Sequence, residues 1–363
     1  MASSVSQPGM QAARMIGSLR ACQTWARVAP IRCSPSKSNG FLLIDAGKSG
    51  SWHAWHGKVC APILVGPDMR AVILLALLVL VWGCNWPIMK IGLAHIQPLW
   101  FCAFRLGLGA LSMFVILVPL GRLRLPPRGD WPVLASLGLL NMAAYLVLSN
   151  LALLVVPAGR SAILAYTTPL WVAPGAALFL GEKLTRGRLA GVLLGLGGIL
   201  VLFNPLSFDW SNGELVIANL MLLAAALVWA AAILHVRGHR WCSSPLDLAP
   251  WQMLVGLVPV TAAAAIFEGA PRPDGSFELA WTLAYNGTLA TAFAFWAAVT
   301  VNRLLPALTV SLSFLCIPAA GLVFSSLLLG EGLTLTNIAG LLLIAGGVGL
   351  VALVGARERR APS

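Results

Sequence analysis

The chain has 363 residues, of which 59% are hydrophobic and only 10% are charged. A soluble globular domain carries about 25% charged residues, so this composition excludes an ordinary soluble protein and indicates a surface that faces lipid. The net charge of +12 does not predict nucleic-acid binding, because most Lys and Arg residues stand in short gaps between apolar segments.

Residues 1–68 differ from everything that follows them. They contain Ser, Gly and Arg residues but no sustained apolar segment. Three interpretations stay open for this leader: a transit peptide, a disordered cytoplasmic tail, or a translation start at Met69. We favour the start at Met69, because Met-Arg followed directly by an apolar helix is how a membrane protein with a short tail would begin.

Ten apolar segments follow Met69, at approximately 70–89, 98–119, 132–153, 158–180, 187–204, 214–236, 247–267, 280–301, 306–329 and 334–354. Each has about 18–24 residues, enough to cross a hydrocarbon layer of ~30 Å as a helix. A helix also satisfies its own backbone hydrogen bonds, which lipid cannot do. We therefore expect an all-α integral membrane protein with ten transmembrane helices.

Charged residues in alternate gaps predict the orientation. One set of gaps holds most of the positive residues: Arg122, Arg124, Arg128, Lys183, Arg186, Arg188, Arg237, Arg240, Arg303, Arg357, Arg359 and Arg360. The positive-inside rule places these gaps in the cytoplasm, and both termini with them. This agrees with an even number of spans in an inner membrane. Lys90, Arg105, Arg160 and Arg272 are exceptions on the outer side.

The chain repeats itself. Residues 181–198 and 330–347 are identical at ten of eighteen positions, including the Gly-Glu pair that opens each stretch. We therefore expect two five-helix units, 69–204 and 214–355, followed by a cytoplasmic tail at 356–363. Because five is odd, the second unit must be inverted relative to the first. Inverted repeats are the architecture of carriers that work by alternating access.

The residues also resemble a known family. The segment from Pro157 to Phe203 (PAGRSAILAYTTPLWVAPGAALFLGEKLTRGRLAGVLLGLGGILVLF) resembles the drug/metabolite transporter superfamily, in particular the ten-helix EamA-type carriers. The stretches VWGCNWPIMKIGL at 81–93 and FCAFRLGLGAL at 101–111 resemble it as well, as does the chain from Asn286 to Leu353. The resemblance implies export of amino acids or related metabolites through a central cavity, driven by the proton gradient or by substrate gradients. It does not identify the substrate.

Polar residues inside a membrane are costly and are therefore candidates for function. In the first span, Trp82 and Asn85 precede Pro87, which should leave a backbone carbonyl free near Gly83. A free carbonyl beside an Asn amide would suit a polar substrate. The alternative is that Pro87 only kinks the helix and that Asn85 bonds a neighbouring helix.

The third and fourth spans supply further candidates for substrate binding. Asn141 and Tyr145 stand four residues apart and share a helix face. Tyr166 and Thr167 come just before Pro169 in the fourth span, and Ser313 precedes Pro318 at the matching place in the ninth. Interrupted helices related by a repeat are typical of transporter sites. The alternative is that the hydroxyl groups bond back to carbonyls that the prolines have freed.

The second unit offers four more candidates. They are Asn219 and Trp229 in the sixth span, and Asn286 and Trp296 in the eighth. Some aromatic residues in these spans would instead be anchors at the membrane surface.

Charged residues within the spans are few. Arg105 lies one or two turns inside the second span, where it either attracts a carboxylate substrate or snorkels to the outer surface. We favour snorkelling. We expect Glu182 and Glu331 to be structural, since each can accept backbone N–H bonds at the start of a helix. No carboxylate lies in the middle of a predicted span, so the sequence identifies no route for proton coupling.

Glycines form a separate pattern. Gly187, Gly191 and Gly195 lie along one face of the fifth span and should let another helix approach closely. The expected partner is the tenth span, with Gly340 and Gly347, and a homodimer contact is the alternative.

The sequence argues against other classes of protein. It contains no H-E-x-x-H, no G-x-S-x-G and no P-loop, so we expect neither an enzyme nor an ATP-driven pump, and no cofactor. The seven Cys residues are scattered and predict neither a metal site nor disulfides. A carrier for sugar, nucleotide or drug-like substrates remains the alternative, and a channel is less favoured. A phosphorylated substrate would require two or more Arg or Lys in the cavity.

Overall fold

The computed structural model describes residues 33–35, 42–44, 69–182, 184–203, 210–305 and 307–360. The chain separates into two units, Met1–Gly66 and Pro67–Ser363. In the first unit, β1 (Cys33–Pro35) pairs with β2 (Leu42–Ile44) in antiparallel register, with Cys33 opposite Ile44. The rest of the 1–68 leader and the end of the tail predicted at 356–363 lie outside the described residues.

In the described part of the second unit, all regular secondary structure is helical. The elements in chain order are α2 (Met69–Leu93), α3 (Pro98–Leu117), η1 (Arg128–Asp130), α4 (Trp131–Ser136), η2 (Leu137–Ala144), α5 (Tyr145–Leu153), α6 (Ala158–Ala165), α7 (Thr168–Phe179), α8 (Arg186–Phe203), α9 (Gly213–Gly238), α10 (Pro245–Phe267), α11 (Phe277–Ala284), η3 (Tyr285–Phe293), α12 (Ala294–Leu304), α13 (Ala307–Phe314), α14 (Cys316–Leu329) and α15 (Leu335–Arg360). The helix expected to end near 354 thus continues to Arg360.

Elements that follow one another directly, or with one or two residues between them, form one longer helical segment, so the described residues contain ten segments at the places of the ten predicted spans. Seven of the described segments are long and apolar enough to cross a membrane: 69–93, 98–117, 128–153, 158–179, 213–238, 245–267 and 335–357. Large apolar side chains are exposed on the outside of the bundle, among them Val115, Leu178, Leu200, Val258 and Leu342. This surface suits lipid, and the prediction of an all-α membrane protein is confirmed.

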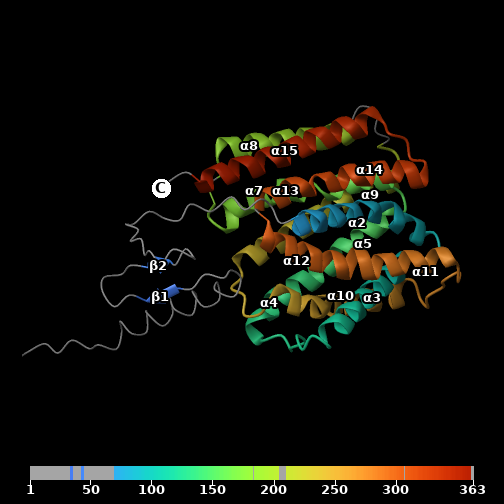
Figure 1. Ribbon diagram of the computed structural model, residues 1–363. Helices are drawn as coiled ribbons and strands as arrows, with labels where there is room; N and C mark the ends of the chain where they lie inside the picture. Colours follow the sequence, from blue (N-terminus) through green and yellow to red (C-terminus); the bar gives the residue numbers. More distant parts are fainter. Residues whose placement is uncertain are drawn as a thin grey trace, which may run out of the picture. The chain divides into compact units, whose positions relative to one another are not determined.

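The segments run side by side, and their connections lie alternately at two ends of the bundle (Figure 1). One end, which we call the Glu331 end, holds the connections at 94–97, 154–157, 268–276 and 330–334. The other, the Glu182 end, holds those at 118–127, 180–185 and 239–244, together with the last turn of α15. The position of the site is described below relative to these two ends.

Helices from the two predicted units pack against one another throughout the bundle. α8 lies along α15, α3 packs against α10, and α2 packs against α14. Gly191 and Gly347 meet between the helices of the first pair: a Cβ atom added to Gly347 would lie 2.5 Å from the carbonyl oxygen of Gly191. The predicted contact between the glycine face of the fifth span and the tenth span is confirmed.

Two of the segments are interrupted. α6 ends at Ala165 and α7 begins at Thr168, while α13 ends at Phe314 and α14 begins at Cys316. Each break stands just before a proline, Pro169 or Pro318, which lacks the backbone N–H that an α-helix needs. Two other segments contain a π-helix in the middle, η2 and η3. π-Helical turns are rare and occur frequently at functional sites.

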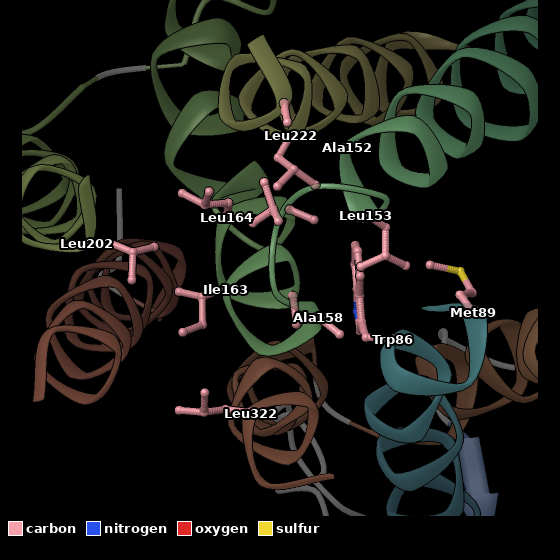
Figure 2. Close-up of a cluster of buried hydrophobic side chains, with 14 of the residues drawn as sticks. Trp86, Met89, Ala152, Leu153, Ala158, Ile163, Leu164, Leu202, Leu222 and Leu322 are labelled. Carbon is pink, nitrogen blue, oxygen red and sulfur yellow. The ribbon is translucent and has the colours of Figure 1, made fainter. Parts of the chain in front are cut away.

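The apolar core centres on α6. Figure 2 shows Ala158, Ile163 and Leu164 of this helix between Leu202 of α8 on one side and Trp86 of α2 on the other. Leu222 of α9 and Leu322 of α14 belong to the same cluster. Because these helices come from both predicted units, the core joins them into one structure.

Candidate functional site

A cavity of about 400 Å³ lies inside the bundle. Its walls come from α2, α3, η2, α5, α9, η3 and α12, together with Tyr166 at the break between α6 and α7. Both π-helical segments contribute to the lining, η2 through Asn141 and η3 through Thr291. The cavity has the size of a site for one small molecule and is lined by residues from both halves of the chain.

Six of the eleven residues that the sequence singled out line this cavity. They are Trp82, Asn85, Asn141, Tyr145, Tyr166 and Trp229. They lie between residues 82 and 229 in the sequence, and the packing of α2, η2, α5 and α9 brings them together.

The other five candidates lie outside the lining. Asn219 and Asn286 are fully buried, and each donates its side-chain N–H to the carbonyl four residues earlier, Leu215 and Thr282 respectively. Thr167 is also buried, and its hydroxyl donates to the carbonyl of Leu164. This bond corresponds to the alternative in which hydroxyl groups satisfy carbonyls beside a proline.

The last two of these five, Trp296 and Ser313, are on helices near the cavity. Trp296 is 40% exposed and packs against Phe293, with 5.8 Å between the ring centroids. Ser313 lies on α13 and is partly buried. Neither contributes to the cavity wall.

The environment of Arg105 differs from the one predicted from the sequence. The favoured interpretation was a side chain that snorkels to the surface, and this is wrong: Arg105 is only 5% exposed and lines the cavity. Its Nε donates to the hydroxyl oxygen of Thr291 at 3.0 Å, and its Nη1 donates to the sulfur of Met89 at 2.8 Å. No Asp or Glu among the described residues forms an ion pair with it.

Thr291 and Met89 are site residues that the sequence analysis missed. Thr291 holds Arg105 in place, and its own hydroxyl donates to the carbonyl of Asn286 at 2.7 Å. It can approach Arg105 because α3 and η3 meet at Gly109 and Gly287, where an added Cβ would overlap the opposite helix. The repeated stretches 181–198 and 330–347 lie 149 positions apart, and the same spacing aligns Thr291 with Met142. Because Met142 stands next to the candidate Asn141, the repeat could have pointed to Thr291.

Asn85 shares a partner with Arg105. Its Nδ2 donates to the same Met89 sulfur at 3.2 Å, so the amide and the guanidinium lie side by side at one end of the cavity. Its Oδ1 is buried and has no hydrogen-bond partner in the described part of the chain. A buried polar atom without a partner is costly, and Asn85 is one of the residues that line the cavity.

Aromatic rings form another part of the wall. The ring of Trp229 lies 5.1 Å from that of Tyr145 and 5.8 Å from that of Tyr166, measured between centroids. Trp82 is fixed by a hydrogen bond from its Nε1 to the carbonyl of Ala290 at 3.1 Å. The cavity therefore combines a small polar region with a large apolar aromatic region.

At the Glu331 end, hydrogen bonds join the start of α3 and the connection at 94–97 to the connection at 268–276. There, Glu268 accepts hydrogen bonds from the backbone N–H groups of Leu99 and Trp100, and His95 contacts Asp274 at 2.6 Å. At the other end, the lining reaches Val236, two residues before α9 ends at Gly238. The lining therefore reaches from Ser149, four residues before α5 ends at Leu153, to the Glu182 end of α9.

Comparison with known proteins agrees with this arrangement. The sequence profile described as the EamA-like transporter family matches residues 69–204 and 216–353. The chain is 28% identical over 269 residues to the "Uncharacterized transporter YoaV" of Bacillus subtilis, covering 74% of this chain and 92% of that protein. It is 28% identical over 296 residues to the "Probable amino-acid metabolite efflux pump" of Salmonella typhimurium, covering 78% and 95% respectively.

A solved crystal structure shares the fold. It superimposes with a TM-score of 0.57 at 22% sequence identity and covers 81% of this chain and 99% of its own. Because the family profile matches most of the chain in two consecutive copies, the resemblance seen in the sequence is confirmed. The chain belongs to the EamA-like transporter family and is a multi-pass membrane transporter rather than an enzyme.

Proposed function

We propose that the protein is a secondary transporter of the inner membrane that exports amino acids or related small metabolites through the described cavity by alternating access. The observation that carries the proposal is the cavity itself. It has about 400 Å³ of space, and its walls come from both stretches that match the family. A site between two repeats is what alternating access requires, since rocking one half against the other exposes it to each side in turn.

The packing of the helices supports an inverted repeat. α8 with α15, and α3 with α10, are pairs of counterparts in the two halves. α2 packs on α14, and its counterpart α9 packs on α6 and α7, which are the counterparts of α13 and α14. The pattern of neighbours is thus preserved when the halves are exchanged, as expected if the two halves are related by a twofold axis.

The direction of the cavity fits an exporter. The positive-inside rule places the Glu182 end and both termini in the cytoplasm. A cavity whose lining reaches Val236, near the Glu182 end, would then take up its substrate from the cytoplasm. The glycine face of α8 packs against α15 of the same chain, so this face is not available for a homodimer contact.

The cavity wall offers few residues that could couple transport to the movement of protons. None of the lining residues is Asp, Glu or His, so the lining offers no carboxylate or imidazole that could carry protons at neutral pH. This favours export driven by the substrate gradient over export coupled to protons. Arg105 is the one Lys or Arg in the lining, and this argues against phosphorylated sugars or nucleotides, which would require more positive charge.

The test is an export measurement with two variants of one helix. The full chain is produced in cells that lack their own efflux systems, the cells are loaded with dipeptides, and each amino acid is followed inside and outside. Ile233→Trp would fill the cavity wall, whereas Ile217→Trp places the same ring on the exposed face of α9. We expect faster release with the wild type and with Ile217→Trp, and loss of that release with Ile233→Trp.

Two outcomes would contradict the proposal. If folded wild-type protein in the membrane released no amino acid or amino-acid metabolite, the substrate would have to be sought among sugars, nucleobases and drugs. If Ile233→Trp exported as fast as the wild type, the cavity would not be the transport path.

A further inference from the structure

We propose that Arg105 and Asn85 form the head-group site for an α-amino acid whose side chain is aromatic or large and apolar. Arg105 binds the carboxylate, and Asn85 accepts a hydrogen bond from the ammonium group. The inference rests on the transport function proposed above and names its substrate class. It follows from the bonds these two side chains make, and from those they lack.

Arg105 is a buried cation with weak partners. A guanidinium has five N–H donors, and burial without a counter-charge is expensive, the more so inside a membrane. The two acceptors that the structure shows for it are the Thr291 hydroxyl and the Met89 thioether. A thioether is a weak acceptor. A carboxylate entering the cavity would replace that weak contact with a charge-assisted pair of hydrogen bonds, the arrangement for which the fork of an Arg side chain is suited.

The position of Arg105 is also fixed in advance. Its Nε is held by Thr291, whose hydroxyl is in turn bonded to the backbone of η3. This leaves the Nη side of the guanidinium directed toward Met89 and the cavity. A side chain that is already held in its binding position loses little conformational entropy when a ligand arrives, which favours affinity.

Asn85 supplies the complementary group. Its Nδ2 and the Nη1 of Arg105 both donate to the Met89 sulfur, so the two side chains are neighbours. The Oδ1 of Asn85 is a buried acceptor with no partner among the described residues. An acceptor next to a cation matches a ligand that carries an ammonium next to a carboxylate. In an α-amino acid the two groups share one carbon, so the ligand brings them close together.

The rest of the cavity determines the side chain of the ligand. The ring of Trp229 contacts those of Tyr145 and Tyr166, and the three side chains present an aromatic wall. Small polar ligands would leave this surface unfilled, whereas an aromatic or large apolar side chain would bury it and gain from stacking. A cavity of about 400 Å³ lies in the range of sites that hold one small molecule.

The test measures binding to the purified full chain in detergent, with three related probes. L-Phenylalanine carries both charged groups, L-phenylalaninol lacks the carboxylate, and 3-phenylpropionate lacks the ammonium group. We expect the wild type to bind L-phenylalanine about tenfold or more tightly than either analogue, because each analogue leaves one buried polar group without a partner.

Two variants assign the preference to its residues. Arg105→Gln should bring the affinities for L-phenylalanine and L-phenylalaninol close to each other and leave the preference for the ammonium group. Asn85→Leu should bring the affinities for L-phenylalanine and 3-phenylpropionate close to each other and leave the preference for the carboxylate. Arg272→Gln removes a positive charge from an exposed loop and should leave all three affinities unchanged. Melting temperatures of the variants show whether each is folded, and Arg105→Lys, which keeps the charge but loses the fork, should bind L-phenylalanine with intermediate affinity.

Three outcomes would overturn the inference. They are equal affinity of the wild type for L-phenylalanine and L-phenylalaninol, an unchanged preference in folded Arg105→Gln protein, and no binding of L-phenylalanine by folded wild-type protein. In each case the export measurement decides separately whether the proposed function stands. Conversely, if Arg105 is shown to bind the carboxylate while cells export no amino acid, the site is correct and the transport proposal fails.

Discussion

Lys90 and Glu331, which belong to different halves of the chain, form an ion pair with 3.3 Å between Nζ and Oε1. The same carboxylate accepts hydrogen bonds from the backbone N–H groups of Ala158 at 2.7 Å and Gly159 at 3.0 Å, the first residues of α6. At the opposite end of the bundle, Arg237 pairs with Glu182, the sequence counterpart of Glu331. Glu331 was expected to be structural, and its place at the start of a helix from the other half shows how it joins the two halves.

The first prediction concerns the stability that Glu331 provides. Glu331→Ala removes an ion pair and two charge-assisted hydrogen bonds at the N-terminus of α6, so it should lower the free energy of unfolding by about 2 kcal/mol or more. The measurement is the melting temperature of the purified full chain. Glu278→Ala is the matched control, since Glu278 is exposed in the first turn of α11. Equal melting temperatures for the two variants would show that Glu331 does not hold the halves together.

The second prediction concerns the contact between α8 and α15. A Cβ atom at Gly347 would lie 2.5 Å from the Gly191 carbonyl oxygen and 2.6 Å from the backbone nitrogen of Gly195. Gly347→Ala must therefore push the helices apart, at a cost of about 1–3 kcal/mol. Gly197→Ala is the control on α8, because nothing lies within 4 Å of its added Cβ. We expect a lower melting temperature for Gly347→Ala alone, and a similar decrease in both variants would contradict the close contact.

The third prediction concerns the aromatic wall. Trp229→Ala removes a ring that contacts Tyr145 and Tyr166, so the preference for L-phenylalanine over L-alanine should decrease by about tenfold, in line with the loss of one aromatic contact. Trp296→Ala removes the same side chain outside the cavity and should leave this ratio unchanged. Binding of both amino acids to purified protein provides the ratio. If Trp229→Ala keeps the wild-type preference, the side chain of the substrate lies elsewhere.

The fourth prediction concerns pH and the connection at the Glu331 end. The pKa of Asp274 is lowered to about 2, first by hydrogen bonds from Ser276 and then by His95. Because the pKa is lower in the folded protein than in the unfolded chain, the stabilisation is complete above pH ~4 and is lost as the pH falls from ~4 toward 2. The melting temperatures of the wild type and Asp274→Asn should differ at pH 6 and converge at low pH.

The control for this measurement is Glu214→Gln, which removes an exposed carboxylate in the first turn of α9. A difference between the wild type and Asp274→Asn that persisted unchanged down to pH 2.5 would mean that ionisation of Asp274 does not cause the effect.

Three asparagines in similar sequence surroundings show what the sequence leaves undecided. Asn85, Asn219 and Asn286 all lie within apolar helices, and all three were candidates for substrate binding. The Nδ2 atoms of Asn219 and Asn286 donate to carbonyls of their own helices, whereas the Nδ2 of Asn85 donates to the Met89 sulfur and Asn85 lines the cavity. The amide N–H of an Asn in a helix can donate to a carbonyl of the preceding turn or to another side chain, so its sequence position does not reveal which acceptor it uses.

The sequence also leaves undecided whether Arg105 is exposed at the membrane surface or buried in the bundle. A long cationic side chain one or two turns inside a span can reach the surface, and nothing in the neighbouring sequence opposes this. Its burial depends on Thr291 and Met89, which come from η3 and α2 and approach α3 only in the folded bundle. The choice between the two conformations is therefore made by contacts between helices.

The sequence by itself determined the membrane-embedded helical architecture, the approximate limits of the segments, the repeated Gly-Glu pattern and the family. These are properties of single segments, because the hydrophobicity and length of a segment do not depend on its neighbours. The tertiary structure alone decided which polar residues share the cavity, that Arg105 is buried beside Asn85, and that Glu331 caps a helix of the other half. These depend on the rotation of each helix about its axis and on its packing partners, which only the folded chain fixes.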